Sequence, residues 1–198
     1  MAEDKTRGER VRKFLLENFN DQMLFSEGLD DALIGIAERC SQPTLAVYDA
    51  TKAIDIFTKL DDANVEKAAQ FIELTNYKVW RGEHSPLWFT PIRMLTDATK
   101  AEAVKRALAK ENPSMLFADG LEAAIIGVAE REGQPTLAVF DSSKCVDIFM
   151  ERDKMDYEGA CEFFDFNVSG GWHGEHTPLW FTALSAITEL EDEVGEEE

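Results

Sequence analysis

The chain repeats itself once, and this repeat constrains its fold more than any other feature. Residues 23–28 (MLFSEG) and 115–120 (MLFADG) begin two stretches that end with the closely similar segments 82–90 and 174–182. Every matched pair is offset by 92 residues without a gap, and about half of the paired residues are identical. The chain is therefore a tandem duplication of one module, and the positions that both copies retain indicate what the module requires.

The length of 198 residues and the period of the repeat predict two small domains. Residues 1–99 form copy one, residues 100–188 form copy two, and the acidic segment 189–198 is expected to be a disordered tail. No linker rich in glycine, serine or proline separates the copies. We therefore expect them to pack on each other as an intramolecular pseudo-dimer about a twofold axis.

Branched and aromatic residues predict three strands in each copy. In copy one, residues 32–39 and 44–49 read as strands that form a hairpin, because Gln42-Pro43 interrupts the apolar pattern between them. Residues 86–90 read as the third strand. The same strands are expected 92 residues later in copy two.

Helical spacing of apolar residues predicts three helices in each copy. The first begins near Arg7, and the second follows Asp49, whose carboxylate is placed to cap it. The third begins at Asn64 in copy one and at Asp156 in copy two, two further residues that favour helix N-termini. The predicted fold class is α+β, with two tandem helix-strand-strand-helix-helix-strand modules.

The formal net charge of −19 is unevenly distributed between the copies. Residues 1–99 carry 12 basic and 17 acidic side chains, whereas residues 100–198 carry 8 and 22. Such a surface repels nucleic acid and anionic lipid, so we expect no direct nucleic-acid partner and no membrane partner. The charge favours a protein partner that has a basic surface.

Cysteine usage and the N-terminus indicate a cytoplasmic protein. Cys40, Cys145 and Cys161 have no cysteine at the matching position of the other copy, which excludes a repeated disulfide or thiolate site. No run of eighteen apolar residues exists, and residues 1–5 lack the pattern of a signal peptide.

The Gly-Glu-His turn that ends each copy is the best candidate for acid–base or metal chemistry. Copy two carries His173, Glu175 and His176 there, and these residues would be the ligands if a metal were bound. Arg81 replaces His173 in copy one, and the chain has only three histidines. We therefore expect no metal, no cofactor and no catalytic residues, and we interpret the turn histidine as a hydrogen-bonding residue.

Charged and polar residues recur at two other places. Asp49, Lys52 and Asp55, with their equivalents in copy two, resemble a charged catalytic cluster, but a helix cap with a solvated face explains them more simply. Glu130, Arg131 and Gln134, with their copy-one equivalents, follow a strand, where they line a binding edge or hold the copies together. We favour the second interpretation, through an arginine–carboxylate pair. The four tryptophans, Trp80, Trp88, Trp172 and Trp180, are interpreted as core residues rather than partner anchors.

Copy two resembles a group of small proteins encoded in bacteriophage and prophage genomes. The resemblance rests on residues 139–150 (VFDSSKCVDIFM), 156–168 (DYEGACEFFDFNV) and 171–178 (GWHGEHTP). Copy one matches less well, because it lacks the cysteine and the Phe-Asn-Val sequence. The resemblance implies a phage accessory protein that acts in the host cytoplasm, and it implies no particular activity.

The leading hypothesis is an acidic, non-enzymatic binding protein that inhibits a host nucleic-acid-binding or defence protein by occupying its basic surface. The residues expected to bind are Glu130, Arg131, Gln134, Glu151, Asp153, Glu158 and Glu162. Two alternatives remain open at this stage. One is a small metal-dependent hydrolase that uses the Gly-Glu-His turn, and the other is a structural or assembly protein of the virion.

Overall fold

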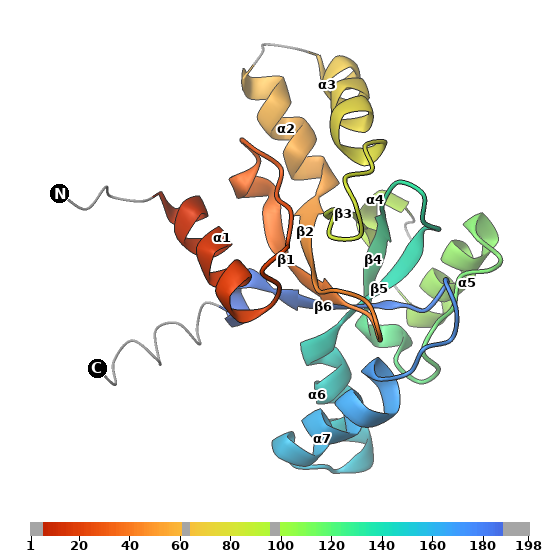
Figure 1. The fold of residues 1–198 in the computed structure, drawn as a ribbon. Helices are drawn as coiled ribbons and strands as arrows, with labels where there is room; N and C mark the ends of the chain where they lie inside the picture. The colour runs from red at the N-terminus through yellow and green to blue at the C-terminus, as the bar shows by residue number, and fades with distance from the viewer. Residues whose placement is uncertain (1–5, 61–63, 96–99, 188–198) are drawn as a thin grey trace, which may run out of the picture.

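The protein forms one closed barrel of six strands with helices packed on its outside (Figure 1). The computed structural model describes residues 6–60, 64–95 and 100–187. Copy one contains α1 (Arg7–Asn18), η1 (Asp30–Ala32), β1 (Leu33–Glu38), β2 (Leu45–Asp49), α2 (Ala50–Leu60), α3 (Val65–Ile72), η2 (Glu73–Tyr77), β3 (Leu87–Pro91) and α4 (Ile92–Leu95). Copy two contains α5 (Ala101–Glu111), η3 (Glu122–Ala124), β4 (Ile125–Glu130), β5 (Leu137–Asp141), α6 (Ser142–Asp153), α7 (Tyr157–Phe164), η4 (Asp165–Ser169) and β6 (Leu179–Ala183).

Each copy supplies three strands, and the two sets complete each other. Within copy one β1 pairs antiparallel with β2, and β2 pairs parallel with β3. Copy two repeats these pairings in β4, β5 and β6. The antiparallel pairs β3–β4 and β1–β6 join the copies and close the barrel.

The prediction of two small modules packed as a pseudo-dimer is therefore wrong, because the copies share a single barrel. A three-stranded sheet has two open edges, whose backbone N–H and C=O groups need partners. Here each edge of one copy pairs with an edge of the other, so no edge remains open in the barrel. The expected disorder of segment 189–198 falls outside the described residues.

The inside of the barrel is a core of its own. Alternate residues of every strand point inward, as the two-residue period of a strand requires. The buried inward set is Ala37, Leu45, Val47, Leu87, Phe89, Ala129, Leu137, Val139, Leu179 and Phe181. At the centre Phe89 of copy one stacks on Phe181 of copy two, with ring centroids 6.2 Å apart and planes 9° apart. The central stack therefore needs one aromatic ring from each copy.

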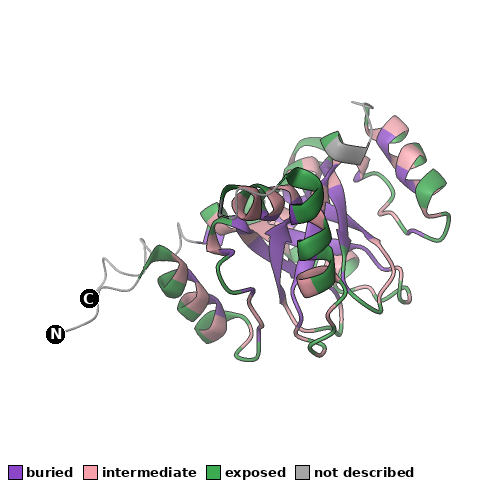
Figure 2. Ribbon diagram, turned by 90° about the horizontal axis from the view of Figure 1, so that it is seen from above, coloured by how far each residue is buried: buried purple, intermediate pink, exposed green. Residues whose placement is uncertain are grey.

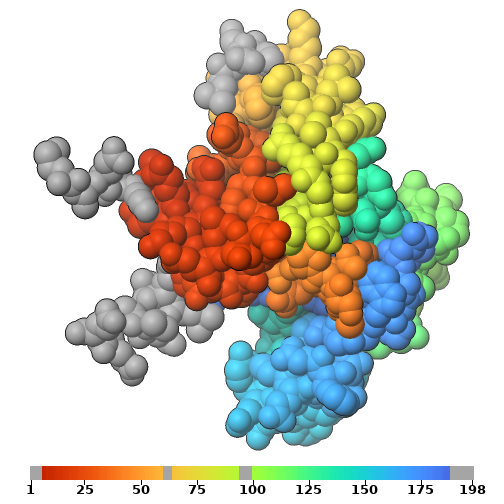
Figure 3. Space-filling model, viewed as in Figure 1, coloured from red at the N-terminus to blue at the C-terminus, as the bar shows by residue number. Residues whose placement is uncertain are grey.

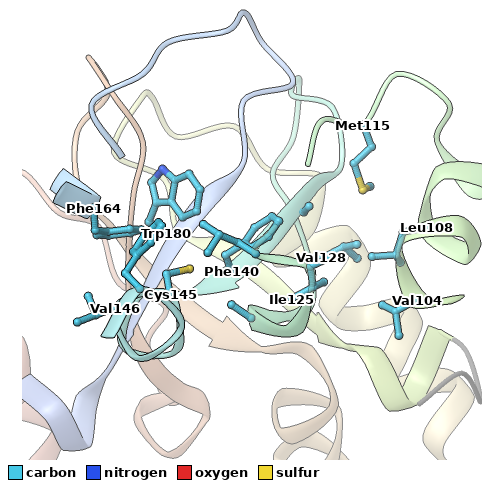
Figure 4. Close-up of a cluster of buried hydrophobic side chains, with 14 of the residues drawn as sticks. Val104, Leu108, Met115, Ile125, Val128, Phe140, Cys145, Val146, Phe164 and Trp180 are labelled. Atoms are coloured by element: carbon cyan, nitrogen blue, oxygen red, sulfur yellow. The ribbon is translucent and has the colours of Figure 1, made fainter. Parts of the chain in front are cut away.

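The outward faces of the strands bury two further clusters under the helices (Figure 2). In copy two, Val104 and Leu108 of α5 and Cys145 of α6 pack toward Phe140 and Trp180 of the barrel wall (Figure 4). Copy one builds the corresponding cluster around other aromatic residues, including Tyr48 and Trp88. The described residues thus form three cores, one central and one for each copy.

Two glycines allow the copies to come together. A Cβ on Gly35 of β1 would lie 2.2 Å from the carbonyl oxygen of Thr182, and one on Gly127 of β4 would lie 2.2 Å from that of Thr90. Neither oxygen can move, because each belongs to the backbone of the neighbouring strand. Only glycine fits at these two cross-copy contacts.

Candidate functional site

The β1–β2 and β4–β5 turns place two buried arginines at one end of the barrel, which we call the arginine mouth. Arg39 follows β1 and Arg131 follows β4, and the two residues are only 7% and 8% exposed. Gln42 and Gln134, with the prolines that follow them, complete the lining of a small cavity between the two turns. The mouth therefore contains residues from the matched turns of both copies.

Each arginine contacts the opposite copy. Arg39 donates hydrogen bonds to the carbonyl oxygen of Glu175 at 3.1 Å and to the side-chain oxygen of Gln134 at 3.3 Å. Arg131 donates to the carbonyl oxygen of Glu83 at 2.5 Å. These contacts link the two copies, as the favoured interpretation predicted. The partner is not the expected carboxylate, because each arginine binds a backbone carbonyl of the opposite copy.

Two tryptophans cover the arginine mouth from outside. The guanidinium of Arg39 lies 5.2 Å from the ring centroid of Trp172, and that of Arg131 lies 5.2 Å from the ring of Trp80. These rings are 45% and 50% exposed, so the expectation of core packing fails for them. A cation–π contact is favourable because the negative face of the ring attracts the guanidinium. Trp88 and Trp180 do lie in the cores.

No carboxylate of the described residues lies within ion-pair distance of either arginine. Burial lowers the pKa of Arg39. Burial and repulsion from Arg39 lower the pKa of Arg131, and attraction by Glu83 opposes them in part. The Nε of Arg131 is buried without a hydrogen-bond partner among the described residues. The mouth is thus a concentrated positive site in an acidic protein.

The Gly-Glu-His turns support the fold rather than gather ligands. In copy one the ring Nδ1 of His84 lies 3.0 Å from the side-chain nitrogen of Asn20, and Leu24 donates its backbone N–H to the His84 carbonyl. This joins the turn to the segment after α1. The Nδ1 of His176 in copy two is buried and has no such partner among the described residues.

The alternative metal ligands are not brought together. Across residues 6–60, 64–95 and 100–187, no three histidine, cysteine or acidic side chains converge as a metal site requires, and this includes His173, Glu175 and His176. The carboxylate of Glu175 instead lies 3.9 Å from Nε2 of its neighbour His176 and is 78% exposed.

The Asp-Lys-Asp clusters cap helices, as predicted. The Asp49 carboxylate accepts backbone hydrogen bonds from Thr51 and Lys52 at the start of α2. Asp141 accepts one from Lys144 at the start of α6, and its carboxylate lies 3.7 Å from the Lys144 ammonium. Both carboxylates are therefore engaged by the first turns of their helices.

The acidic candidates lie in two different places. Glu130 ends β4, where it accepts a hydrogen bond from Thr136, close to the arginine mouth. Glu151 and Asp153 lie on α6, and Glu158 and Glu162 lie on α7, all of them exposed. The structure therefore separates the turn residues from the helical acids.

An exposed aromatic surface accompanies the helical acids, and sequence reasoning missed it. Tyr157 at the start of α7 is 66% exposed and Phe166 in η4 is 86% exposed. Phe166, Glu162 and Asp165 line a shallow depression together. We call Tyr157, Glu158, Glu162, Asp165 and Phe166 the acidic aromatic face. It could have been found from the repeat, because copy one keeps apolar residues at the places of Tyr157 and Phe166.

Those copy-one equivalents are exposed as well. Val65 is 61% and Leu74 is 67% exposed, on α3 and η2. Both η2 and η4 are single π-helical turns that continue an α-helix, a feature that occurs often at functional positions. In Figures 1 and 3, α3 and α7 lie on opposite sides of the barrel. The two faces therefore belong to opposite sides of the molecule.

A larger pocket of about 650 Å³ opens in copy two beside the Trp180 ring. Apolar side chains form most of its wall, and Asp119, Arg152, Asn167, His173 and Thr177 supply polar groups. The Arg152 guanidinium is held by the Asp153 carboxylate at 2.7 Å and by the Gly120 carbonyl at 3.2 Å. Its charge is therefore compensated within the chain.

Comparison of the chain with protein-family models, with curated proteins and with solved structures found no significant match. Within the described residues, no helix has the length and apolar character needed to cross a membrane.

Proposed function

We propose that the protein is a non-enzymatic binding protein that uses the acidic aromatic face of copy two to occupy a basic surface of a host protein. Following the phage resemblance of copy two, the partner we propose is a nucleic-acid-binding or defence protein, which is inhibited when its basic surface is covered. The observation that carries the proposal is the exposure of Phe166 among carboxylates.

The arrangement of this face fits such a partner. Glu158 and Glu162 are four residues apart on α7 and so lie along one side of it, and Phe166 in η4 lines the same depression as Glu162. Aromatic residues are enriched among those that contribute most to protein interfaces, whereas rim charges chiefly set the rate of encounter. We expect Phe166 to act as the anchor and the glutamates to steer the partner.

Copy one offers a natural contrast on an equivalent backbone. Leu74 replaces Phe166, Gln70 replaces Glu162, and Val65 replaces Tyr157, whereas Glu66 matches Glu158. The copy-one face thus retains apolar exposure with fewer acids and no aromatic ring at these positions. This contrast supports copy two as the stronger binding face for a basic partner.

The test begins with capture by the immobilised full-length chain from host cells, followed by kinetics with the purified captured protein. We expect the captured protein to be basic, and its association rate with the chain to fall at least about tenfold between low and physiological salt. Duplex DNA should compete with the chain and release the captured protein from it. The double variant Glu158→Lys/Glu162→Lys should slow association. The matched control, Glu66→Lys/Gln70→Lys in copy one, should have a much smaller effect.

A second pair of variants separates anchoring from steering. Phe166→Ser should raise the dissociation rate with little change in association, and Leu74→Ser is its copy-one control. Equal effects of the two charge-reversal variants, or binding that is indifferent to salt, would contradict the proposal.

A further inference from the structure

We propose that the arginine mouth is a binding site for a small inorganic anion of the chloride class, held between Arg39 and Arg131. This site lies at the end of the barrel and is separate from the acidic aromatic face, so the inference does not depend on the proposed function.

The cavity in the mouth is small. It has a volume of about 10 Å³, which is the space that one water-sized body needs. Its floor is made of inward leucines of the barrel, including Leu45 and Leu137, and its rim is made of the arginines, the glutamines and their neighbouring prolines.

The polar groups around the cavity favour an anion. The two arginines are more than nine-tenths buried, and neither forms an ion pair with a carboxylate among the described residues. The attraction of Glu83 raises the pKa of Arg131, but burial and repulsion from Arg39 outweigh it, and the net shift is downward. Glu83 and Glu175 offer their backbone carbonyls to the arginines, whereas their carboxylates are 73% and 78% exposed and lie beside histidines.

One donor is left over at the site. The Nε of Arg131 is buried and unpaired within the described residues, although Nη1 of the same guanidinium donates to the Glu83 carbonyl. A buried donor without an acceptor is costly, and a charged one more so. An anion in the cavity would accept from this group and offset the repulsion between the arginines, which contributes to the lowered pKa of Arg131.

The wild-type protein gives the first test, by thermal unfolding in sodium chloride, sodium bromide and sodium gluconate at matched ionic strength. Matching is needed because salt of any kind screens the acidic surface. We expect the Tm in chloride and bromide to exceed that in gluconate by roughly 3 °C. Crystals soaked in bromide should show an anomalous peak between the two guanidinium groups.

Two variants connect the effect to the site. Arg131→Gln should lose the difference between chloride and gluconate, whereas Arg152→Gln, which alters an exposed arginine paired with Asp153, should retain it. If Arg131→Gln fails to fold, the bromide peak in the wild-type protein decides the question. Absence of that peak overturns the proposal, whether or not chloride raises the Tm, because the anion would then act elsewhere or water would fill the cavity.

Discussion

The two copies build equivalent backbones and use them differently. Their strand pairings match residue for residue: Val47 pairs with Leu87 in copy one, and Val139 pairs with Leu179 in copy two. Most of their sequence differences lie on the outer helices, and some lie in the turns, such as Arg81 against His173 and Ser41 against Gly133. Closing one barrel from two copies therefore constrains the strands most and leaves the outer surface free to diverge.

Beneath the helices, copy one is the more polar of the two. The Tyr48 hydroxyl accepts a hydrogen bond from the Ser26 backbone at 3.1 Å, whereas the matching residue of copy two is Phe140. Copy two instead carries Cys145, which is 0% exposed, where copy one has Ala53. Each difference suggests a substitution that gives one copy the residue found in the other, namely Tyr48→Phe and Cys145→Ala. Because the other copy already carries that residue, the fold accepts it.

The largest expected effect tests what the copies have in common. Gly35→Ala and Gly127→Ala should each destabilise the protein by about 3 kcal/mol or more, because the new Cβ would meet the backbone of the neighbouring strand. Chemical denaturation measures the change. Gly133→Ala is the control, because a Cβ there meets no atom within 4 Å and only its positive φ of 72° costs energy. If only one of the two variants, Gly35→Ala or Gly127→Ala, lost stability, the two cross-copy contacts would not be equivalent.

The next prediction concerns alkaline pH and the buried thiol of copy two. Burial raises the pKa of Cys145 from 9.0 to about 12. Because the folded pKa lies above the unfolded value, this contribution to stability is complete below about pH 9 and is lost as the pH rises toward 12. Between pH 8 and about pH 10.5, wild-type protein should lose roughly 2 kcal/mol more than Cys145→Ala does.

Urea denaturation across this pH range measures the difference. Both the wild-type protein and the variant contain Tyr48, and burial raises the pKa of its hydroxyl to about 12. Both proteins should therefore lose stability at high pH. Only the additional loss of stability in the wild-type protein is caused by ionisation of the Cys145 thiol. Parallel curves for the wild-type protein and the variant would mean that Cys145 ionises in the fold as it does in the unfolded chain.

The sequence predicted the order of the helices and strands along each copy better than their arrangement. Local signals were sufficient for the caps, since Asn64 and Asp156 accept backbone hydrogen bonds where their residue types indicated helix starts. Strand pairing across the copies was missed. Pairing depends on which sheet edges remain open once each copy has folded. The alternation of inward and outward residues in β1 and β3 does not indicate which strand will pair with them.

The candidate site was predicted in part, for a related reason. Arg131 and Gln134 drew notice because polar residues kept in both copies are unusual where no core requires them. Phe166 was missed because an aromatic residue in an apolar helical pattern reads as core, and helical spacing places Tyr157 on the same side as the buried residues Ala160 and Phe164. Exposure depends on where the helix ends relative to the barrel, which the sequence does not state.

A smaller effect is expected from the polar contact that only copy one has. Tyr48→Phe should cost about 1 kcal/mol, because it leaves the buried backbone N–H of Ser26 without its acceptor. Thermal or urea denaturation at neutral pH measures this cost. Tyr157→Phe in copy two is the control, since its ring is 66% exposed and its loss should be within about 0.5 kcal/mol. If the two variants were equally stable, the Ser26 hydrogen bond would contribute nothing to copy one.

The smallest expected effect on stability is also the one that relates stability to the proposed function. Glu158 and Glu162 are four residues apart on α7, so their like charges repel, whereas copy one pairs Glu66 with the neutral Gln70. Glu162→Gln gives copy two the copy-one residue and should raise the free energy of unfolding by about 0.3 kcal/mol at low salt. If the acids exist to steer a basic partner, the same variant should slow association with that partner. A more stable protein that binds at an unchanged rate would mean that Glu162 serves neither the fold nor the partner, and the contrast between the two faces would then rest on Phe166 and Tyr157 alone.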